Sequence, residues 1–367
     1  MSDDDLFEAQ KAKILIVGSG GGGCNTVTRL YEMGITGAKV VALNTDAKHL
    51  SITKADKRIL LGKNITKGLG AGGYPEVGKD AAIEAKNEII DILDGVDLVF
   101  ATCGLGGGTG TGSLPVVARL AKDRGAIVIA AVTLPFKLEG SRVDKAEEGL
   151  AVLRENCDTV IVIENQKLLA FAGNMPLKKA FGVADDLIAT MIKGITETIS
   201  EPSLVNLDYA DVKAVMKSGG VASIGTGRSN DTTNRAQQAV MKALNHPLLD
   251  VNYAGASGAL IQIIGSEDMT LDEVNTIGEA VSSHLNKNAQ TIWGARIIPK
   301  FDGIQVISII TGVKSAYILG PTGAEDKKAS AMKHSTKDSD GFRSSDSSKG
   351  SGSSKSSGDN DLGIDML

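Results

Sequence analysis

The stretch that decides the fold is Gly104-Leu105-Gly106-Gly107-Gly108-Thr109-Gly110-Thr111-Gly112. An apolar run, residues 96–103, leads into it, and a helical pattern that begins near Pro115 leads away. A strand, a glycine turn and a helix start in this order aim consecutive backbone N–H groups at one place. Six glycines in nine residues let a phosphate approach the backbone, and Thr109 and Thr111 add hydroxyl donors. We predict a phosphate-binding loop, because a purely structural turn needs only one or two glycines.

The composition limits the classes of protein to consider. The length of 367 residues suits two domains and a tail, and 42% hydrophobic residues suffice for sizeable cores. A net charge of −5 argues against a general nucleic-acid-binding surface. The cysteines at 24, 103 and 157 show neither disulfide nor zinc spacing, which fits a reducing compartment. No apolar run is long enough to span a bilayer, and the acidic N-terminus is unlike a secretory signal. We therefore expect a soluble cytoplasmic protein without a nucleic-acid partner or direct membrane insertion.

Two further glycine loops belong to the same half of the chain. A predicted strand, residues 13–17, runs into the glycines at 18–23 and a helix over 26–33; the next strand, 40–43, ends in Asn44-Thr45-Asp46. This unit alone also suits a dinucleotide fold with Asp46 on the ribose, so a nicotinamide-dependent oxidoreductase is one alternative. The other loop, residues 68–78, has no clear strand before it and would alone suit a flexible surface loop. Three such loops favour a triphosphate, while the missing G-x-x-x-x-G-K-[ST] pattern argues against an ordinary P-loop NTPase.

The rest of the chain predicts a mainly parallel sheet followed by a second layer. Strands over 126–133 and 159–163 alternate with helices over 79–93 and 143–155, so ligand-binding loops belong at the strand C-termini. Residues 177–200 form the longest amphipathic pattern and predict a helix that acts as a spine between two domains. A small α+β layer is predicted after it, with turns at glycines 219–220 and 225–227, helices over 211–216, 234–244 and 271–285, and strands over 259–264, 295–299 and 304–311.

Asp208 and Asp211 lie three residues apart at a predicted helix start directly after the spine helix. Carboxylates at this position are ordinary N-terminal caps worth about 1 kcal/mol. They also suit the polarisation of a water, but a negative pair beside a triphosphate in the same site would repel it. Both demands are met if the pair acts on a nucleotide that another molecule holds.

The C-terminal stretch changes composition. From residue 324, Ser, Gly, Lys and Asp dominate, which predicts a flexible linker. The last residues, 361–367, turn apolar again and favour a docking peptide on a tether, the alternative being a terminus without function.

Taken together, these motifs resemble the tubulin/FtsZ superfamily, and within it the FtsZ family of polymerising GTPases of prokaryotic cell division. Residues 104–112 are similar to the signature loop, and 206–211 to the loop whose aspartates complete the active site of the neighbouring subunit. The resemblance covers about residues 12–320. It implies an α/β fold in which a Rossmann-like parallel-sheet GTPase domain is joined by a long central helix to a smaller α+β domain, with a disordered tail. The implied divisions are a flexible N-terminus (1–12), GTP-binding domain (13–176), central helix (177–200), C-terminal domain (201–320), linker (321–358) and docking peptide (359–367).

The resemblance also implies site residues. Catalytic roles fall to Asp208, Asp211 and Asn206, with GTP or GDP as the nucleotide, Mg²⁺ bridging its phosphates and no protein metal ligands. Phe181 would stack on guanine, Asp185 would bond the edge of the base, and Glu139 and Arg142 would contact ribose and phosphates. The full implied nucleotide-binding set is Gly21, Gly22, Gly23, Cys24, Asn25, Asn44, Asp46, Ala71, Gly72, Gly73, Gly104, Gly106, Gly107, Gly108, Thr109, Gly110, Glu139, Arg142, Asn165, Phe181 and Asp185.

Three departures from the bacterial pattern favour an archaeal branch of the family. We expect the chain to be one of two paralogues in its host. Glu139 and Arg142 are three residues apart where many bacterial members have four, the tail peptide lacks the usual proline and terminal basic residue, and the second domain varies more freely. The resemblance implies head-to-tail homopolymers, a division ring at midcell, and a membrane adaptor or other division proteins as partners of the C-terminal peptide. A tubulin-like filament for cell shape or DNA segregation is the remaining alternative.

Overall fold

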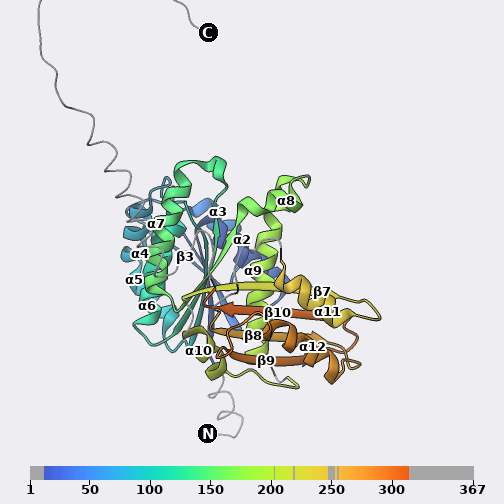
Figure 1. Ribbon diagram of the computed structural model, residues 1–367. Helices are drawn as coiled ribbons and strands as arrows, with labels where there is room; N and C mark the ends of the chain where they lie inside the picture. Colours follow the sequence, from blue (N-terminus) through green and yellow to red (C-terminus); the bar gives the residue numbers. More distant parts are fainter. Residues whose placement is uncertain (1–11, 202, 218–219, 247–252, 254–255, 314–367) are drawn as a thin grey trace, which may run out of the picture. The chain divides into compact units, whose positions relative to one another are not determined.

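The computed structural model describes residues 12–201, 203–217, 220–246, 253 and 256–313. Within these ranges ten strands form one sheet in the order β3-β2-β1-β4-β5-β6-β7-β10-β8-β9 (Figure 1). The strands are β1 Ile14–Ser19, β2 Ala38–Asn44, β3 Lys57–Leu60, β4 Leu98–Gly104, β5 Ile127–Leu134, β6 Thr159–Glu164, β7 Gly220–Ser229, β8 Gly258–Gly265, β9 Gln290–Ile297 and β10 Ile304–Thr311.

The helices that cover this sheet are α2 Gly20–Met33, α3 Ala47–Ile52, α4 Pro75–Glu84, α5 Lys86–Leu93, α6 Thr109–Lys122, α7 Ser141–Asn156, α8 Leu168–Ala172, α9 Leu177–Ser200, α10 Tyr209–Lys217, α11 Arg235–Leu244 and α12 Leu271–Ser282. Two short 3₁₀ turns, η1 Lys137–Glu139 and η2 Asn165–Lys167, follow β5 and β6.

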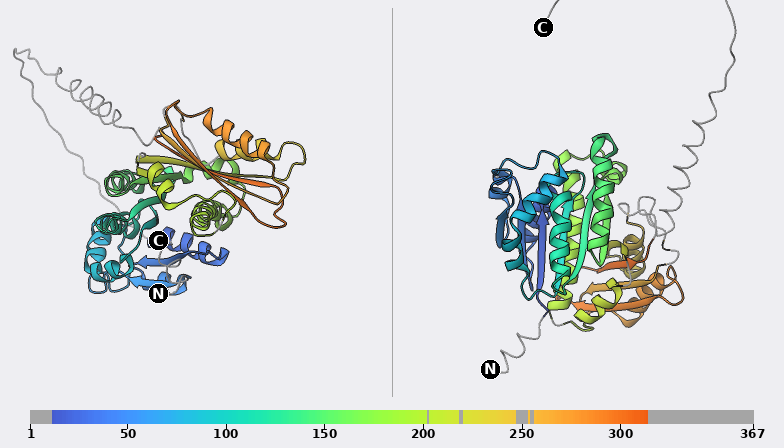
Figure 2. Two further views of the ribbon diagram at one scale, coloured as in Figure 1. Left: turned by 90° about the horizontal axis from the view of Figure 1, so that it is seen from below. Right: turned by 90° about the vertical axis from the view of Figure 1, so that its left-hand side faces the viewer.

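The half of the sheet from β3 to β7 is parallel throughout. Helices lie on both of its faces (Figure 2). Its strands are therefore near-continuous runs of Val, Ile, Leu and Ala, and β1 is buried at all six positions. In a parallel sheet the loops after the strands gather at one edge. The predicted parallel α/β architecture is confirmed, and this edge is where the glycine loops must meet.

The second half of the sheet continues the first without a break. β6 pairs with β7 in parallel, β10 pairs antiparallel with both β7 and β8, and β9 pairs in parallel with β8 at the edge. The predicted turns at Gly225 and Gly227 are wrong, because both glycines lie inside β7. A Cβ added to Gly225 would lie 1.8 Å from the carbonyl oxygen of Ala243, so helix α11 packs directly on the strand backbone.

Two apolar cores lie on the two faces of the sheet. Buried side chains of α4, α5, α6, α7, α11 and α12 belong to one core, and those of α2, α9 and α10 to the other. Helix α9 packs along both halves of the sheet, because its Leu187 and Ile192 share a core with Ile16 of β1 and with Leu260 and Ile307 of β8 and β10. Its bounds, Leu177–Ser200, are those predicted for the spine helix.

Several boundaries differ from the prediction. Helix α2 begins at Gly20, inside the glycine run, and α6 begins at Thr109, inside the motif that leads to Pro115. The helix predicted over 79–93 divides at Ala85 into α4 and α5. The short strand β3 before the third glycine loop was missed, since two of its four residues are charged and exposed.

Part of the prediction lies outside the described residues. This applies to most of the flexible N-terminus (1–12), the linker (321–358) and the docking peptide (359–367). Among the residues that are described, no helix has both the length and the apolar character required to cross a membrane.

Candidate functional site

A large cleft lies at the C-terminal ends of the parallel strands. Its volume is about 1530 Å³, and its walls come from the start of α2, the ends of β2 and β4, the segment after β5, and the first turns of α9. It brings together much of the predicted nucleotide-binding set: Gly21, Gly22, Asn25, Asn44, Asp46, Gly104, Gly107, Gly108, Thr109, Gly110, Glu139, Arg142, Asn165, Phe181 and Asp185. Residues from six separate loops and helices thus meet in one cavity.

The glycines of the cleft serve two different purposes. Around Gly21 and Gly107 a Cβ would meet no atom closer than 3.8 Å, so these two positions leave open space toward the cleft. At Gly22 a Cβ would lie 2.9 Å from the nitrogen of Gly104, and at Gly108 it would lie 2.8 Å from the nitrogen of Tyr74. The glycine loops are therefore packed backbone against backbone, which holds their amides in fixed positions.

Hydroxyl groups tie the loops together beneath the cleft. The hydroxyls of Thr45 and Thr109 are 2.6 Å apart, and so are those of Ser19 and Ser113. Thr111 was predicted to offer a donor to phosphate, but its oxygen accepts a 2.9 Å hydrogen bond from the Gly106 N–H, and the residue is buried. That threonine shapes the loop instead of facing a ligand.

Six predicted residues do not line the cleft: Gly23, Cys24, Ala71, Gly72, Gly73 and Gly106. Gly23 packs against the backbone of β4, where a Cβ would lie 2.4 Å from the oxygen of Thr102. The Cys24 thiol lies in the core, bonded to the carbonyl of Leu43, and burial raises its pKa to about 11. Any contact from Cys24 to a ligand is thereby limited to its backbone.

Glu139 and Arg142 face the cleft as a pair. One Glu139 oxygen accepts a 2.9 Å bond from the Phe136 N–H, and the other accepts from Arg142 at 2.5 Å. The three-residue spacing places both side chains on adjacent turns, η1 and the start of α7, so that they bond each other. Arg142 remains about half exposed, which leaves its remaining N–H donors available to an anion.

The end of the cleft formed by α9 carries an aromatic ring and a carboxylate. Phe181 is 40% exposed and meets Phe136 edge to face, with ring centroids 5.6 Å apart. Asp185, one turn later, accepts a 2.8 Å hydrogen bond from the Thr26 hydroxyl. Burial raises the pKa of Asp185 from 3.8 to about 6; the bond from Thr26 opposes this rise, and the nearby Asp186 adds to it.

Asn165 supplies a polar group that the chain itself leaves unsatisfied. Its side-chain oxygen Oδ1 is buried and has no hydrogen-bond partner among the described residues, although the residue lines the cleft. Buried acceptors are normally paired, so this atom matches a ligand with an N–H or O–H donor.

The sequence did not predict that Phe136 and Thr26 would contact the residues of this cleft. For Phe136, the available signal was its position just beyond the predicted strand 126–133.

Asp208 and Asp211 lie at the opposite end of the sheet. They cap α10 reciprocally, since the Asp211 N–H donates to Asp208 at 2.8 Å and the Asp208 N–H to Asp211 at 3.3 Å. The Tyr209 hydroxyl donates to the carbonyl of Asp97, which directly precedes β4, whereas the cleft lies beyond the last residue of β4. A strand of this length spans roughly 20 Å. In Figure 1, α10 accordingly lies at the lower end and α3 and α8 at the upper end.

The loop that carries these aspartates is held firmly. Val205 and Ala295 exchange two backbone hydrogen bonds of 3.1 Å each, which joins the loop to the edge strand β9. Leu207 is buried against Gly294, where a Cβ would lie 2.7 Å from the leucine side chain. The oxygen of the predicted Asn206 accepts a 2.7 Å bond from the Ser203 N–H, which stabilises the turn before Asp208.

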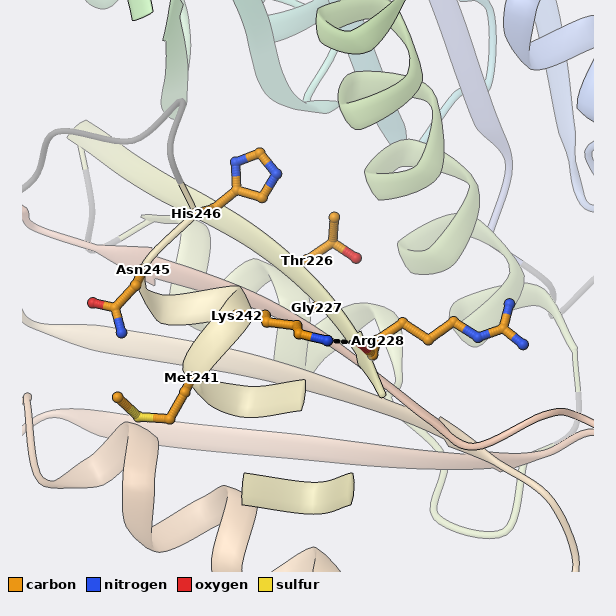
Figure 3. A pocket seen from close by; sticks show the side chains of 7 residues that line it. All are labelled: Thr226, Gly227, Arg228, Met241, Lys242, Asn245 and His246. Atoms are coloured by element: carbon orange, nitrogen blue, oxygen red, sulfur yellow. Dashed lines mark hydrogen bonds between the residues drawn. The ribbon is translucent and has the colours of Figure 1, made fainter. Parts of the chain in front are cut away.

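A second pocket, of about 530 Å³, lies between β7 and α11 (Figure 3). None of the predicted site residues lines it. Its side chains do not converge: His246 and Met241 point away from each other, and Lys242 donates to the carbonyl of Arg228. Its composition indicates no particular ligand.

Comparison with known proteins identifies the family. The GTPase domain of the Tubulin/FtsZ family matches residues 13–173, and the C-terminal domain of the FtsZ family matches residues 220–314. "Cell division protein FtsZ 2" of Methanocaldococcus jannaschii is 56% identical over 85% of this chain and 83% of its own length. The chain belongs to the FtsZ family. The FtsZ 2 protein of Halobacterium salinarum is 50% identical over 89% of this chain and 83% of its own length, so the predicted archaeal affinity is confirmed.

Solved structures of FtsZ agree with the fold. An empty FtsZ dimer from M. jannaschii superposes with a TM-score of 0.79 at 50% identity, covering 87% of this chain and 97% of the other. CetZ2 from Haloferax volcanii, at 21% identity and a TM-score of 0.72, shares the fold. As an FtsZ-family member, the chain binds guanine nucleotide and is a GTPase of the cell-division cytoskeleton, and the family implies self-association into filaments. The nicotinamide alternative is not supported, since the GTPase domain match includes the glycines at 18–23.

Proposed function

We propose that the chain forms head-to-tail filaments and hydrolyses GTP at the contact between consecutive subunits. One observation carries this proposal: the cleft and the Asp208–Asp211 pair lie at opposite ends of the same sheet. A single chain cannot bring them together, but a second copy stacked on the first can. Such a contact joins two different surfaces and does not close, so it extends into an open filament.

The end of the cleft at α9 suits guanine. Phe181 offers a partly exposed ring for stacking, and Asp185 four residues later offers a carboxylate to the two N–H groups on the edge of the base. The unpaired oxygen of Asn165 accepts one further donor from the nucleoside. Adenine lacks the donor pair that Asp185 would bind, so this arrangement selects guanine nucleotides.

The glycine loops suit the phosphates. A Cβ at Gly21 or Gly107 would meet open space, so a phosphate can approach the backbone there, and the N-termini of α2 and α6 add partial positive charge. The described residues contain no group of three His, Cys, Asp or Glu side chains arranged to hold a metal ion. Mg²⁺ would supply charge neutralisation when bound, and the phosphate oxygens of GTP together with water would provide most of its ligands.

Hydrolysis requires an oriented water and stabilisation of the charge that develops on the phosphate oxygens. The loop amides stabilise that charge from the subunit that holds GTP. Asp208 and Asp211 of the next subunit orient the water, with Asn206 supporting the turn that presents them. Because each subunit supplies one half of a site to each of its two neighbours, turnover per subunit should rise with protein concentration as filaments form.

Complementation between two inactive variants tests the shared site. Thr109→Arg fills the phosphate region but keeps the Asp208–Asp211 loop, and Asp211→Ala keeps the cleft but lacks the pair. Each should be inactive alone. An equal mixture should recover up to about a quarter of the wild-type rate, because roughly one contact in four pairs an intact cleft with an intact loop.

Sedimentation with GTP would first establish that both variants enter mixed filaments. A mixture of co-sedimenting variants that stays inactive would exclude a site shared between subunits. Appreciable GTP hydrolysis by Asp211→Ala alone, below the concentration of assembly, would show that Asp208 and Asp211 only cap α10 and take no part in catalysis.

For the cell, we propose assembly at the midcell ring, with the segment 359–367 recruiting a membrane adaptor or other division proteins. The proposal is supported by the cell-division names of the archaeal relatives and by the apolar pattern of the last residues. Imaging of a tagged chain with and without residues 359–367 tests it. Midcell bands that persist without this segment would exclude its recruiting role, and filaments along the cell body would favour a cell-shape function.

A further inference from the structure

Lys145, on the first half of α7, is directly connected to the third glycine loop. Its Nζ donates a 2.8 Å hydrogen bond to the carbonyl oxygen of Gly73 and lies 5.3 Å from the ring centroid of Tyr74. The chain separation between Lys145 and Gly73 is 72 residues, so this is a tertiary link. Neither Lys145 nor Tyr74 belongs to the predicted site residues.

The two elements that Lys145 links both pack on residues 104–112. Helix α7 approaches at Gly106, where a Cβ would lie 2.5 Å from the oxygen of Arg142. The third loop approaches at Gly108, where a Cβ would lie 2.8 Å from the nitrogen of Tyr74. Lys145 therefore fixes the distance between two supports of the phosphate-binding loop.

The third loop depends on such ties for its position. At its start, the Gly70 N–H donates a 3.1 Å hydrogen bond to the backbone carbonyl oxygen of Thr45, and at its end the loop continues into α4. Between them, Gly72 and Gly73 have positive φ angles, and a Cβ on Gly73 would meet no atom within 4 Å. The bond from Lys145 adds an anchor at Gly73, between the bond of Gly70 to Thr45 and the backbone contact of Tyr74 with Gly108.

We propose that Lys145 is a positioning residue that holds the Gly72–Gly73 segment against the phosphate-binding loop, ready for the terminal phosphate of GTP. This rests on the proposed function and on a place for the third loop close to the terminal phosphate, which the family resemblance implies for residues 68–78 and which Gly70 in the lining of the cleft supports. GDP lacks the terminal phosphate, so its binding does not depend on the position of this segment. Lys145 thus contributes to the discrimination between GTP and GDP without touching the nucleotide.

Replacement of Lys145 by Met tests the proposal, since Met keeps the length and loses the donor and the charge. Equilibrium binding of GTP and GDP, measured below the concentration of assembly, should show GTP affinity about tenfold weaker and GDP affinity unchanged within about twofold. Hydrogen exchange of the amides in residues 70–74 should accelerate without nucleotide. Lys145→Arg, which restores a donor and a cation over the Tyr74 ring, should recover most of both properties.

Lys79→Met is the matched control, because Lys79 is an exposed lysine on the neighbouring helix α4. It should leave the GTP to GDP affinity ratio and the exchange of residues 70–74 unchanged. The proposal is overturned if Lys145→Met leaves both readouts unchanged, or if it weakens GTP and GDP equally while exchange accelerates over the whole chain. Failure of the wild-type chain to bind either nucleotide would instead overturn the proposed function.

Discussion

Replacement of Asp185 by Asn gives the sharpest test of the base-binding end of the cleft. The carboxylate accepts a 2.8 Å bond from Thr26 and has oxygen lone pairs left for the two N–H donors of guanine. An Asn side chain offers one acceptor and one donor group. It therefore suits xanthine, which presents one donor and one carbonyl on the same edge, and it mismatches guanine.

The size of the effect follows from the chemistry of the bonds. Hydrogen bonds to a charged group contribute about 1.5–3 kcal/mol each, and a mismatched donor adds the cost of an unpaired polar group. Loss of about 3 kcal/mol corresponds to roughly 100-fold weaker GTP binding. XTP should bind the Asn variant better than GTP, which reverses the order expected for the wild type.

The raised pKa of Asp185 adds a second, independent readout. Because the pKa in the folded chain is about 6, the carboxylate is mostly protonated at pH 5, and wild-type GTP affinity should fall about tenfold between pH 7 and pH 5. The Asn variant should show no such dependence in this range.

The same shift predicts an opposite effect on stability. A carboxylic acid with a raised folded pKa destabilises the fold above pH 6, and this cost disappears as the pH falls from 6 to the ordinary value of 3.8. After allowance for partial exposure, Asp185→Asn should stabilise the nucleotide-free chain by on the order of 1–2 kcal/mol at pH 7.5. At pH 4 the gain should vanish.

Titrations with GTP and XTP, together with thermal unfolding at both pH values, measure these effects. Asp186→Asn is the matched control, since its carboxylate is about half exposed and pairs with Arg29 at the surface. It should leave the base preference unchanged and move the pH profile only slightly toward lower pH, because Asp186 is the smallest of the three influences on the pKa of Asp185. Wild-type GTP affinity in Asp185→Asn, without any gain for XTP, would refute the assignment of Asp185 to the base.

Three other substitutions probe the remaining parts of the structure. Gly294→Ala places a methyl group 2.7 Å from Leu207, so it should displace the aspartate loop and lower GTP turnover at least tenfold, while GTP binding measured by titration stays unchanged. Gly225→Ala forces a methyl group onto the oxygen of Ala243 and should cost more than about 3 kcal/mol, read as a lower denaturant midpoint. Phe181→Ala removes the stacking ring and should weaken GTP and GDP about tenfold alike, as measured by competition titration.

The sequence predicted the elements with strong local signals. Helix α9 and strand β10 have the predicted bounds, because a long amphipathic stripe and an apolar run leave little ambiguity. The glycine motif at 104–112 predicted the edge of the sheet where the cleft lies, since a ligand-binding loop follows a parallel strand.

The predictions that failed concern residues whose positions depend on contacts between segments distant in the sequence. Gly225 and Gly227 read as turns because glycine weakens a strand, yet helix α11 requires glycine there in order to approach β7. The hydrogen bond that turns Thr111 inward and the burial of Cys24 likewise come from the folded surroundings. The sequence therefore located the cleft and many residues of its lining, but it did not reveal that the side chains of Thr111 and Cys24 turn away from it.

The glycines explain why this cleft suits an enzyme whose second half arrives from outside. A loop that must be completed by another subunit gains nothing from flexibility, because any disorder would have to be removed at each contact. Backbone packing at Gly22 and Gly108 fixes the phosphate end before a neighbour arrives, and the double hydrogen bond from Val205 to Ala295 fixes the aspartate loop at the other end. If the proposed shared site is correct, two rigid halves at opposite ends of one sheet make hydrolysis depend on assembly, and GTP turnover then reports the number of subunit contacts and not the number of subunits.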